Sequence, residues 1–197
     1  MLIDAVFNHL GPSGNYLPEF GPYLSSGSNP WGESINIADA GADQVRRYIL
    51  DCALRWMRDF HADGLRLDAV HALVDTTAIH ILEEMSAETE ALAGELGHPL
   101  SLVAESDMND PRLITPRDQG GLGMTAQWDD DIHHAIHTAV SGERQATTAI
   151  SARSRRWPRR CGTATSTRAR SRRSVSAATA GRWTPPRFPR HVCWPTR

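Results

Sequence analysis

Short apolar runs alternate with longer segments of helical periodicity over most of this 197-residue chain. Runs at 2–7, 64–70 and 100–104 are typical of buried strands, and a less regular run follows near 124–128. The segments that connect them carry apolar residues at three- and four-residue steps, which is typical of amphipathic helices. Strands that alternate with helices predict parallel βα units, so an α/β fold is the first expectation.

Two helices are expected between the first three strands, and a third after the fourth. The first should begin near Asp43, and its apolar positions are Val45, Tyr48, Ile49, Cys52, Trp56 and Phe60. The second should run from about Thr76 to Leu96 and stop at Gly97, since glycine commonly ends a helix. Its inward positions are Ile79, Leu82 and Met85. The last helix carries His133, His134 and His137.

Four parallel strands cannot close an eight-stranded (β/α)8 barrel, which typically needs about 250 residues. The chain should therefore form either a smaller open sheet or part of a larger barrel. Because the sequence opens directly on a strand at Leu2, we expect a partial (β/α)8 TIM barrel over residues 1–145, holding roughly its third to sixth strands. The segment 11–41, rich in Gly, Pro, Ser and Asn, is expected to be a long functional loop.

Ionisable side chains gather where three of the predicted strands end. Asp4 and His9 accompany the first strand, Arg66 and Asp68 the second, and Glu105 the third. In parallel barrels this end of the strands builds the active site. We therefore expect these side chains to meet at one edge of the sheet.

Asp68 and Glu105 would end neighbouring strands and could work as a pair of carboxylates. Such strands lie about 4.8 Å apart, so the two groups could approach to the roughly 5–5.5 Å that retaining glycosidases use. Arg66 points to the same side of its strand as Asp68 and should orient that carboxylate and favour its charged form. Partial burial of Glu105 beside another carboxylate would raise its pKa, as a general acid requires.

The three segments resemble signature regions of the alpha-amylase superfamily of glycoside hydrolases: an Asp-x-x-x-Asn-His strand, a Gly-x-Arg-x-Asp strand and a strand that ends in Glu. Other stretches narrow the resemblance to malto-oligosyltrehalose trehalohydrolases, among them Trp56-Met-Arg-Asp-Phe-His and Ala104-Glu-Ser-Asp-Met-Asn-Asp-Pro. The similarity covers residues 1 to about 145. It implies a complete enzyme that hydrolyses the α-1,4 bond next to the trehalose end of maltooligosyltrehalose, without an organic cofactor.

The resemblance also implies a role for each site residue. Asp68 would be the nucleophile, Glu105 the acid/base, and Arg66 the group that positions Asp68. Asp4 would brace Arg66, while His9 and His71 would contact the sugars on the two sides of the scissile bond. The family's third carboxylate, an Asp after a His on a later strand, has no counterpart here, so we expect weak or no activity from this chain alone.

No metal is expected. Asn8, which contacts calcium in many amylases, is expected to have a structural hydrogen-bonding role. Acidic and His residues near the last predicted helix have pairs at helical spacing that could bind a metal, but no His-Glu-x-x-His pattern accompanies them. They are Asp129, Asp130, Asp131, His133, His134 and His137.

The composition changes abruptly after Ile150. Residues 1–150 contain 8 Arg and all 23 acidic residues, a net of −15, whereas residues 151–197 contain 13 Arg and no Asp or Glu, a net of +13. The whole chain lacks Lys. We interpret residues 146–197 as an out-of-frame translation of GC-rich DNA that should be disordered. A basic arm that binds nucleic acid is the alternative.

The start of the sequence has no basic segment and carries Asp4 within its apolar run, which argues against a signal peptide or membrane span there. The three Cys suit neither a disulfide framework nor a zinc site. We expect a cytoplasmic enzyme that acts on maltooligosyltrehalose or a related α-glucan, with neither nucleic acid nor membrane as partner. The alternatives are a branching enzyme or alpha-amylase of the same superfamily, and an Arg-tailed nucleic-acid-binding protein.

Overall fold

A four-stranded parallel sheet is the centre of the computed structural model, which describes residues 1–143. Its strands lie in the order β1 (Leu2–Ala5), β4 (Gly64–Leu67), β5 (Ser101–Ser106) and β6 (Ala126–Asp129). Every neighbouring pair is parallel. The predicted α/β fold and its four strands are confirmed, and the predicted disordered segment 146–197 lies outside the described residues.

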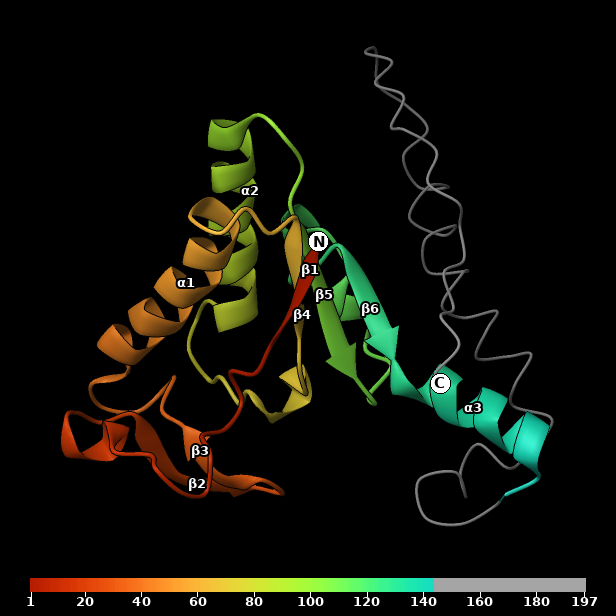
Figure 1. The fold of residues 1–197 in the computed structure, drawn as a ribbon, viewed down its shortest axis with the longest axis horizontal. Helices are drawn as coiled ribbons and strands as arrows, with labels where there is room; N and C mark the ends of the chain where they lie inside the picture. The colour runs from red at the N-terminus through yellow and green to blue at the C-terminus, as the bar shows by residue number, and fades with distance from the viewer. Residues whose placement is uncertain (144–197) are drawn as a thin grey trace.

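Helices α1 (Ala42–Arg58) and α2 (Ile81–Leu96) lie beside one another on one side of this sheet (Figure 1). Leu65, Leu67 and Leu102 of the sheet pack with both helices in a single buried cluster. Helix α3 (Asp130–Ser141) follows β6 and carries the predicted histidines. Short 3-10 helices occupy Leu17–Glu19, Val70–Ala72, Pro111–Leu113 and Arg117–Gln119. Within residues 1–143, none of the helices is long and apolar enough to cross a membrane.

The predicted inward face of α1 is partly wrong. Tyr48 and Trp56 are exposed, and the exposed Phe60 lies beyond the end of the helix. The buried positions instead include Leu50 and Met57. The face of α1 that packs inward differs from the predicted one because it also includes Arg46, which is buried and forms ion pairs with Asp75 and Glu84.

Helix α2 begins later than predicted, at Ile81 rather than near Thr76, and Ile79 is 56% exposed rather than inward. The reason is the side chain of Asp75, which accepts hydrogen bonds from the backbone N–H groups of Thr77 and Ile81 and holds the intervening chain out of a helix. The helix ends at Gly97 in the left-handed conformation, as predicted.

The long segment 11–41 is not only loop. It contains an antiparallel hairpin of β2 (Leu24–Asn29) and β3 (Gly32–Ile35), which lies near the carboxyl ends of β1 and β4 (Figure 1). The side chain of Asn29 accepts a hydrogen bond from Trp31 N–H at the turn. Ser, Gly and Asn in these strands gave no alternation of apolar and polar residues.

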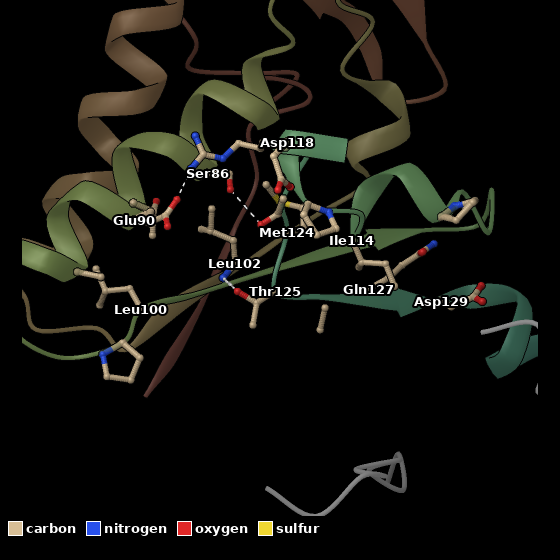
Figure 2. Close-up of a pocket in the computed structure, with 18 of the residues that line it drawn as sticks. Ser86, Glu90, Leu100, Leu102, Ile114, Asp118, Met124, Thr125, Gln127 and Asp129 are labelled. Carbon is tan, nitrogen blue, oxygen red and sulfur yellow. Dashed lines mark hydrogen bonds and ion pairs between the residues drawn. The ribbon is translucent and has the colours of Figure 1, made fainter. Parts of the chain in front are cut away.

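A cavity of about 1020 Å³ lies on the helix-covered face of the sheet. Figure 2 shows it between α2, which carries Glu90, and the strands that carry Leu102 and Gln127. Side chains alternate along a strand, so Leu102 and Gln127 face away from the side of Glu105. The cavity is therefore separate from the predicted carboxylate pair.

Candidate active site

The predicted site residues meet at the carboxyl ends of β1, β4 and β5. Asp4 lies opposite Arg66 in the β1–β4 register, and the N–H of Asp68 donates to Ala5 O, which extends the pairing one residue further. Because Leu67 of β4 pairs with Ala104 of β5, the residues that follow them, Asp68 and Glu105, are level with one another in adjacent segments of the sheet. The strand pairing thus brings the two acids side by side.

One guanidinium contacts all three acids of the site. Arg66 Nη1 donates to Asp4 Oδ1 at 2.6 Å and to Asp68 Oδ1 at 3.1 Å, while its Nη2 lies 3.9 Å from Glu105 Oε2. Asp68 and Glu105 must therefore extend from the same face of the sheet. Arg66 thus contacts both Asp4 and Asp68, while the roles predicted for them, that Asp4 braces Arg66 and Arg66 positions Asp68, stay predictions.

Asn8 holds the second oxygen of Asp68. Its fully buried side chain donates to the Asp68 backbone oxygen at 2.7 Å and to Oδ2 at 3.2 Å, and its own Oδ1 contacts His9 Nδ1. With Arg66 on Oδ1, both carboxylate oxygens of Asp68 are oriented. Asn8 belongs to the Asp-x-x-x-Asn-His segment, where a structural hydrogen-bonding role was expected for it rather than contact with the substrate.

Glu105 is the most buried acid of the site, with 12% of its side chain exposed. Its Oε2 accepts a short hydrogen bond from the N–H of Ala69, whose left-handed backbone (φ 42°) turns that group towards it. Burial, and next a side-chain hydrogen bond with Asp130, raise the pKa of Glu105 to about 7. The rise was predicted, but the acid that contributes to it is Asp130 on α3 rather than Asp68.

The rings of His9, Trp31 and His71 form an aromatic group next to Asn8. The rings of His9 and Trp31 stack at 5.9 Å between centroids, and Trp31 lies 6.1 Å from the ring of His71. Asn29 of the hairpin donates to the backbone oxygen of Asn8, which attaches the hairpin to the end of β1. Trp31 thus lies between His9 and His71, an arrangement that the sequence alone did not predict.

The acidic and His residues of α3 contact neighbouring side chains. Within residues 1–143, no group of three or more His, Cys, Asp or Glu side chains is arranged to hold a metal ion. His137 instead contacts Glu143 at 2.7 Å, and His133 packs against His134.

Comparison with known proteins finds close relatives of this chain. A malto-oligosyltrehalose trehalohydrolase of Mycobacterium tuberculosis is 78% identical over 145 residues, which are 74% of this chain and 25% of that protein. One from Saccharolobus solfataricus is 45% identical over 146 residues, with the same coverage. Over about three quarters of its length, the chain is closely similar to these malto-oligosyltrehalose trehalohydrolases. It spans about a quarter of the length of these curated relatives.

Other comparisons support the same superfamily. The crystal structure of a protein described as an alpha amylase from Salmonella typhimurium matches 78% of this chain and 26% of its own, with 38% identity and a TM-score of 0.66. A 1,4-alpha-glucan branching enzyme of Corynebacterium jeikeium is more distant, at 27% identity over 144 residues, 64% of this chain and 18% of that enzyme. No protein-family model matches the chain.

Proposed function

We propose that residues 1–143 are the third to sixth strands of a (β/α)8 barrel in a glycoside hydrolase that releases trehalose from maltooligosyltrehalose. The observation that carries this proposal is the sharing of Arg66 by two level carboxylates, Asp68 and Glu105, together with the burial that raises the pKa of Glu105 to about 7. Two carboxyl groups on one face of adjacent strands, one of them buried enough to act as an acid, suit a retaining glycosidase. The named relatives favour trehalose release over branching.

The chemistry is a double displacement. Glu105 gives its proton to the glycosidic oxygen as the C–O bond breaks, and Asp68 forms a new C–O bond to the anomeric carbon. Glu105, now ionised, takes a proton from water as the water oxygen displaces Asp68 from that carbon. Arg66 and Asn8 hold the two oxygens of Asp68, so the attacking atom is oriented before the sugar arrives.

The aromatic group supplies the sugar contacts in this proposal. His9 and His71 flank Trp31, a residue that is 46% exposed and whose ring would offer an apolar surface for a pyranose face. The substrate is an α-glucan that ends in trehalose. We also propose a cytoplasmic location for the enzyme.

A chimera tests the proposal on these residues. Residues 1–143 would replace the matching segment of the M. tuberculosis relative, whose remaining three quarters supply the rest of the barrel. We expect the chimera to release free trehalose from maltooligosyltrehalose, and its Asp68→Asn variant to lose about 10³-fold or more in kcat. Asp51→Asn, an exposed acid of α1, is the matched control and should retain full activity.

Two outcomes would overturn the proposal. One is a folded chimera that transfers glucan chains to α-1,6 positions and yields no trehalose, which would indicate a branching enzyme. The other is an Asp68→Asn variant that releases trehalose as fast as the unchanged chimera.

A further inference from the structure

The guanidinium of the candidate active site also contacts an aromatic ring from β6. The Cζ atom of Arg66 lies over the ring of Trp128, 5.7 Å from the ring centroid. This distance is within the roughly 6 Å at which a cation is attracted to the electron-rich face of an indole. Arg66 belongs to β4 and Trp128 to β6, and β5 lies between these strands in the sheet. The two side chains therefore meet over β5.

The strand register places Trp128 level with the two proposed catalytic acids. Trp128 pairs with Glu105 of β5, and Asp68 is level with Glu105 on its other side. Paired residues of neighbouring strands extend to the same face of a sheet, so Trp128 lies on the face of the acids. Arg66 pairs with Val103, two residues before Glu105, and its long side chain reaches forward along the sheet to the level of the ring.

Arg66 is attracted in two directions across the sheet. On the β1 side, its shortest ion pair is with the largely exposed Asp4, at 2.6 Å. On the β6 side, its guanidinium carbon lies over Trp128, and its Nη2 is 3.9 Å from Glu105. The N–H groups of a guanidinium bind carboxylates in its plane while its faces can contact a ring, so these contacts do not compete. Without the ring, the ion pair with Asp4 would draw Arg66 towards β1 and away from Glu105.

We propose that Trp128 is a positioning residue, whose ring holds Arg66 beside the proposed nucleophile Asp68 and the proposed acid/base Glu105. Trp128 acts through Arg66 and does not touch the reacting atoms. The effect on catalysis rests on the proposed function, whereas the contact between the two side chains can be tested without it. Trp128 is 45% exposed, so a smaller apolar side chain at this position should still allow the chain to fold.

A double-mutant cycle in the 197-residue chain tests the contact. Urea unfolding would be measured for the unchanged chain, Trp128→Leu, Arg66→Gln and the double variant. If the ring attracts the guanidinium, the double variant should be more stable than the two separate losses predict, by a factor of about 5 in the unfolding equilibrium constant. Trp56→Leu is the matched control, because Trp56 is a partly exposed tryptophan of α1 that contacts Phe60, and it should combine with Arg66→Gln without such a factor.

Two results of these cycles would overturn the proposal. One is a factor below about 2 for Trp128→Leu with Arg66→Gln. The other is an equal factor for Trp56→Leu, which would indicate a general effect of losing a tryptophan. If Trp128→Leu does not fold, the unchanged chain provides the test, since NMR should show a nuclear Overhauser effect between the indole protons of Trp128 and the δ-CH2 group of Arg66. Its absence would also overturn the proposal.

The chimera tests the effect on catalysis. Trp128→Leu should reduce kcat about tenfold with KM changed by less than about threefold, and Trp128→Phe, which keeps a ring, should recover most of the loss. A rise in KM at unchanged kcat would overturn the proposal, because it would mean that Trp128 contacts the sugar instead of positioning Arg66. A chimera that releases no trehalose, together with the expected factor in the cycle, would reject the proposed function and keep the contact.

Discussion

Arg66 Nη1 lies between two acids, 2.6 Å from Asp4 Oδ1 and 3.1 Å from Asp68 Oδ1, so a single nitrogen joins the ends of β1 and β4. The other nitrogen of the same plane, Nη2, extends towards Glu105 at 3.9 Å. The planar fork of arginine makes these contacts from one side chain, which the single ammonium of lysine cannot do. The two proposed catalytic carboxylates are therefore linked through Arg66.

Arg66→Lys should reduce kcat of the chimera by about 10²-fold, a loss of roughly 2.7 kcal/mol of transition-state stabilisation. Asp4→Asn should cost less, about fivefold or under, because the Asp4 side chain is 62% exposed and its ion pair is screened by water. Steady-state kinetics with maltooligosyltrehalose measure both. Arg58→Lys at the exposed end of α1 is the control, and equal rates for Arg66→Lys and the unchanged chimera would contradict the expectation.

Glu105 should make the chain less stable at alkaline pH. Its pKa is raised from 4.5 to about 7 in the folded state, so the folded chain binds more protons than the unfolded chain between these values. The stabilising contribution is present below about 4.5 and is lost as pH rises through 7. Glu105→Gln keeps the shape without titrating and should reduce the loss of stability between pH 5 and pH 8 by roughly 1–3 kcal/mol.

Urea unfolding of the unchanged 197-residue chain and of its Glu105→Gln variant, each at pH 5 and pH 8, measures this effect. The other titrating groups contribute equally to the two proteins, so the difference between them reports on Glu105. Glu95→Gln, an exposed acid near the end of α2, is the control and should leave the difference as it was. The expectation is contradicted if Glu105→Gln loses as much stability between pH 5 and pH 8 as the unchanged chain does.

The sequence predicted the strands and the acids at their ends because apolar runs followed by charge are local signals. Strand pairing then placed Asp68 beside Glu105 without further information. The contribution of Asp130 to the raised pKa of Glu105 was not predicted, because three consecutive acids at the start of α3 look alike in the sequence. Tyr48 and Trp56 were wrongly predicted to face inward. Helical periodicity takes account of apolar residues only, so it could not show that the face of α1 that carries Arg46 would be buried by its ion pairs.

The pairing of β4 with β5 leaves no room for a side chain at Gly64. A Cβ atom there would lie 2.1 Å from the backbone oxygen of Ser101, which cannot move without breaking the ladder. Gly64→Ala should therefore destabilise the chain by about 2–4 kcal/mol. Gly94→Ala is the matched control, since its Cβ meets nothing within 4 Å on α2 and should stabilise by about 0.5–1 kcal/mol. Similar thermal melting of both variants would contradict this account of the register.

Trp31 allows the sugar-binding part of the proposed function to be tested apart from its chemistry. The ring lies between His9 and His71 at the hairpin turn, its contacts lead to Asp68 through His9 and Asn8, and Trp31 is nearly half exposed. Its loss should therefore weaken substrate binding more than it slows bond cleavage.

In the chimera, Trp31→Ala should raise KM for maltooligosyltrehalose about tenfold, which corresponds to roughly 1.4 kcal/mol of lost contact, while kcat stays within about threefold. Phe20→Ala is the control from the same segment, since that side chain is 79% exposed. A fall in kcat with an unchanged KM would instead mean that Trp31 acts by holding His9 in place. Trp31→Phe separates the two cases, because a smaller ring should recover much of the binding but restore the His9 stack only in part.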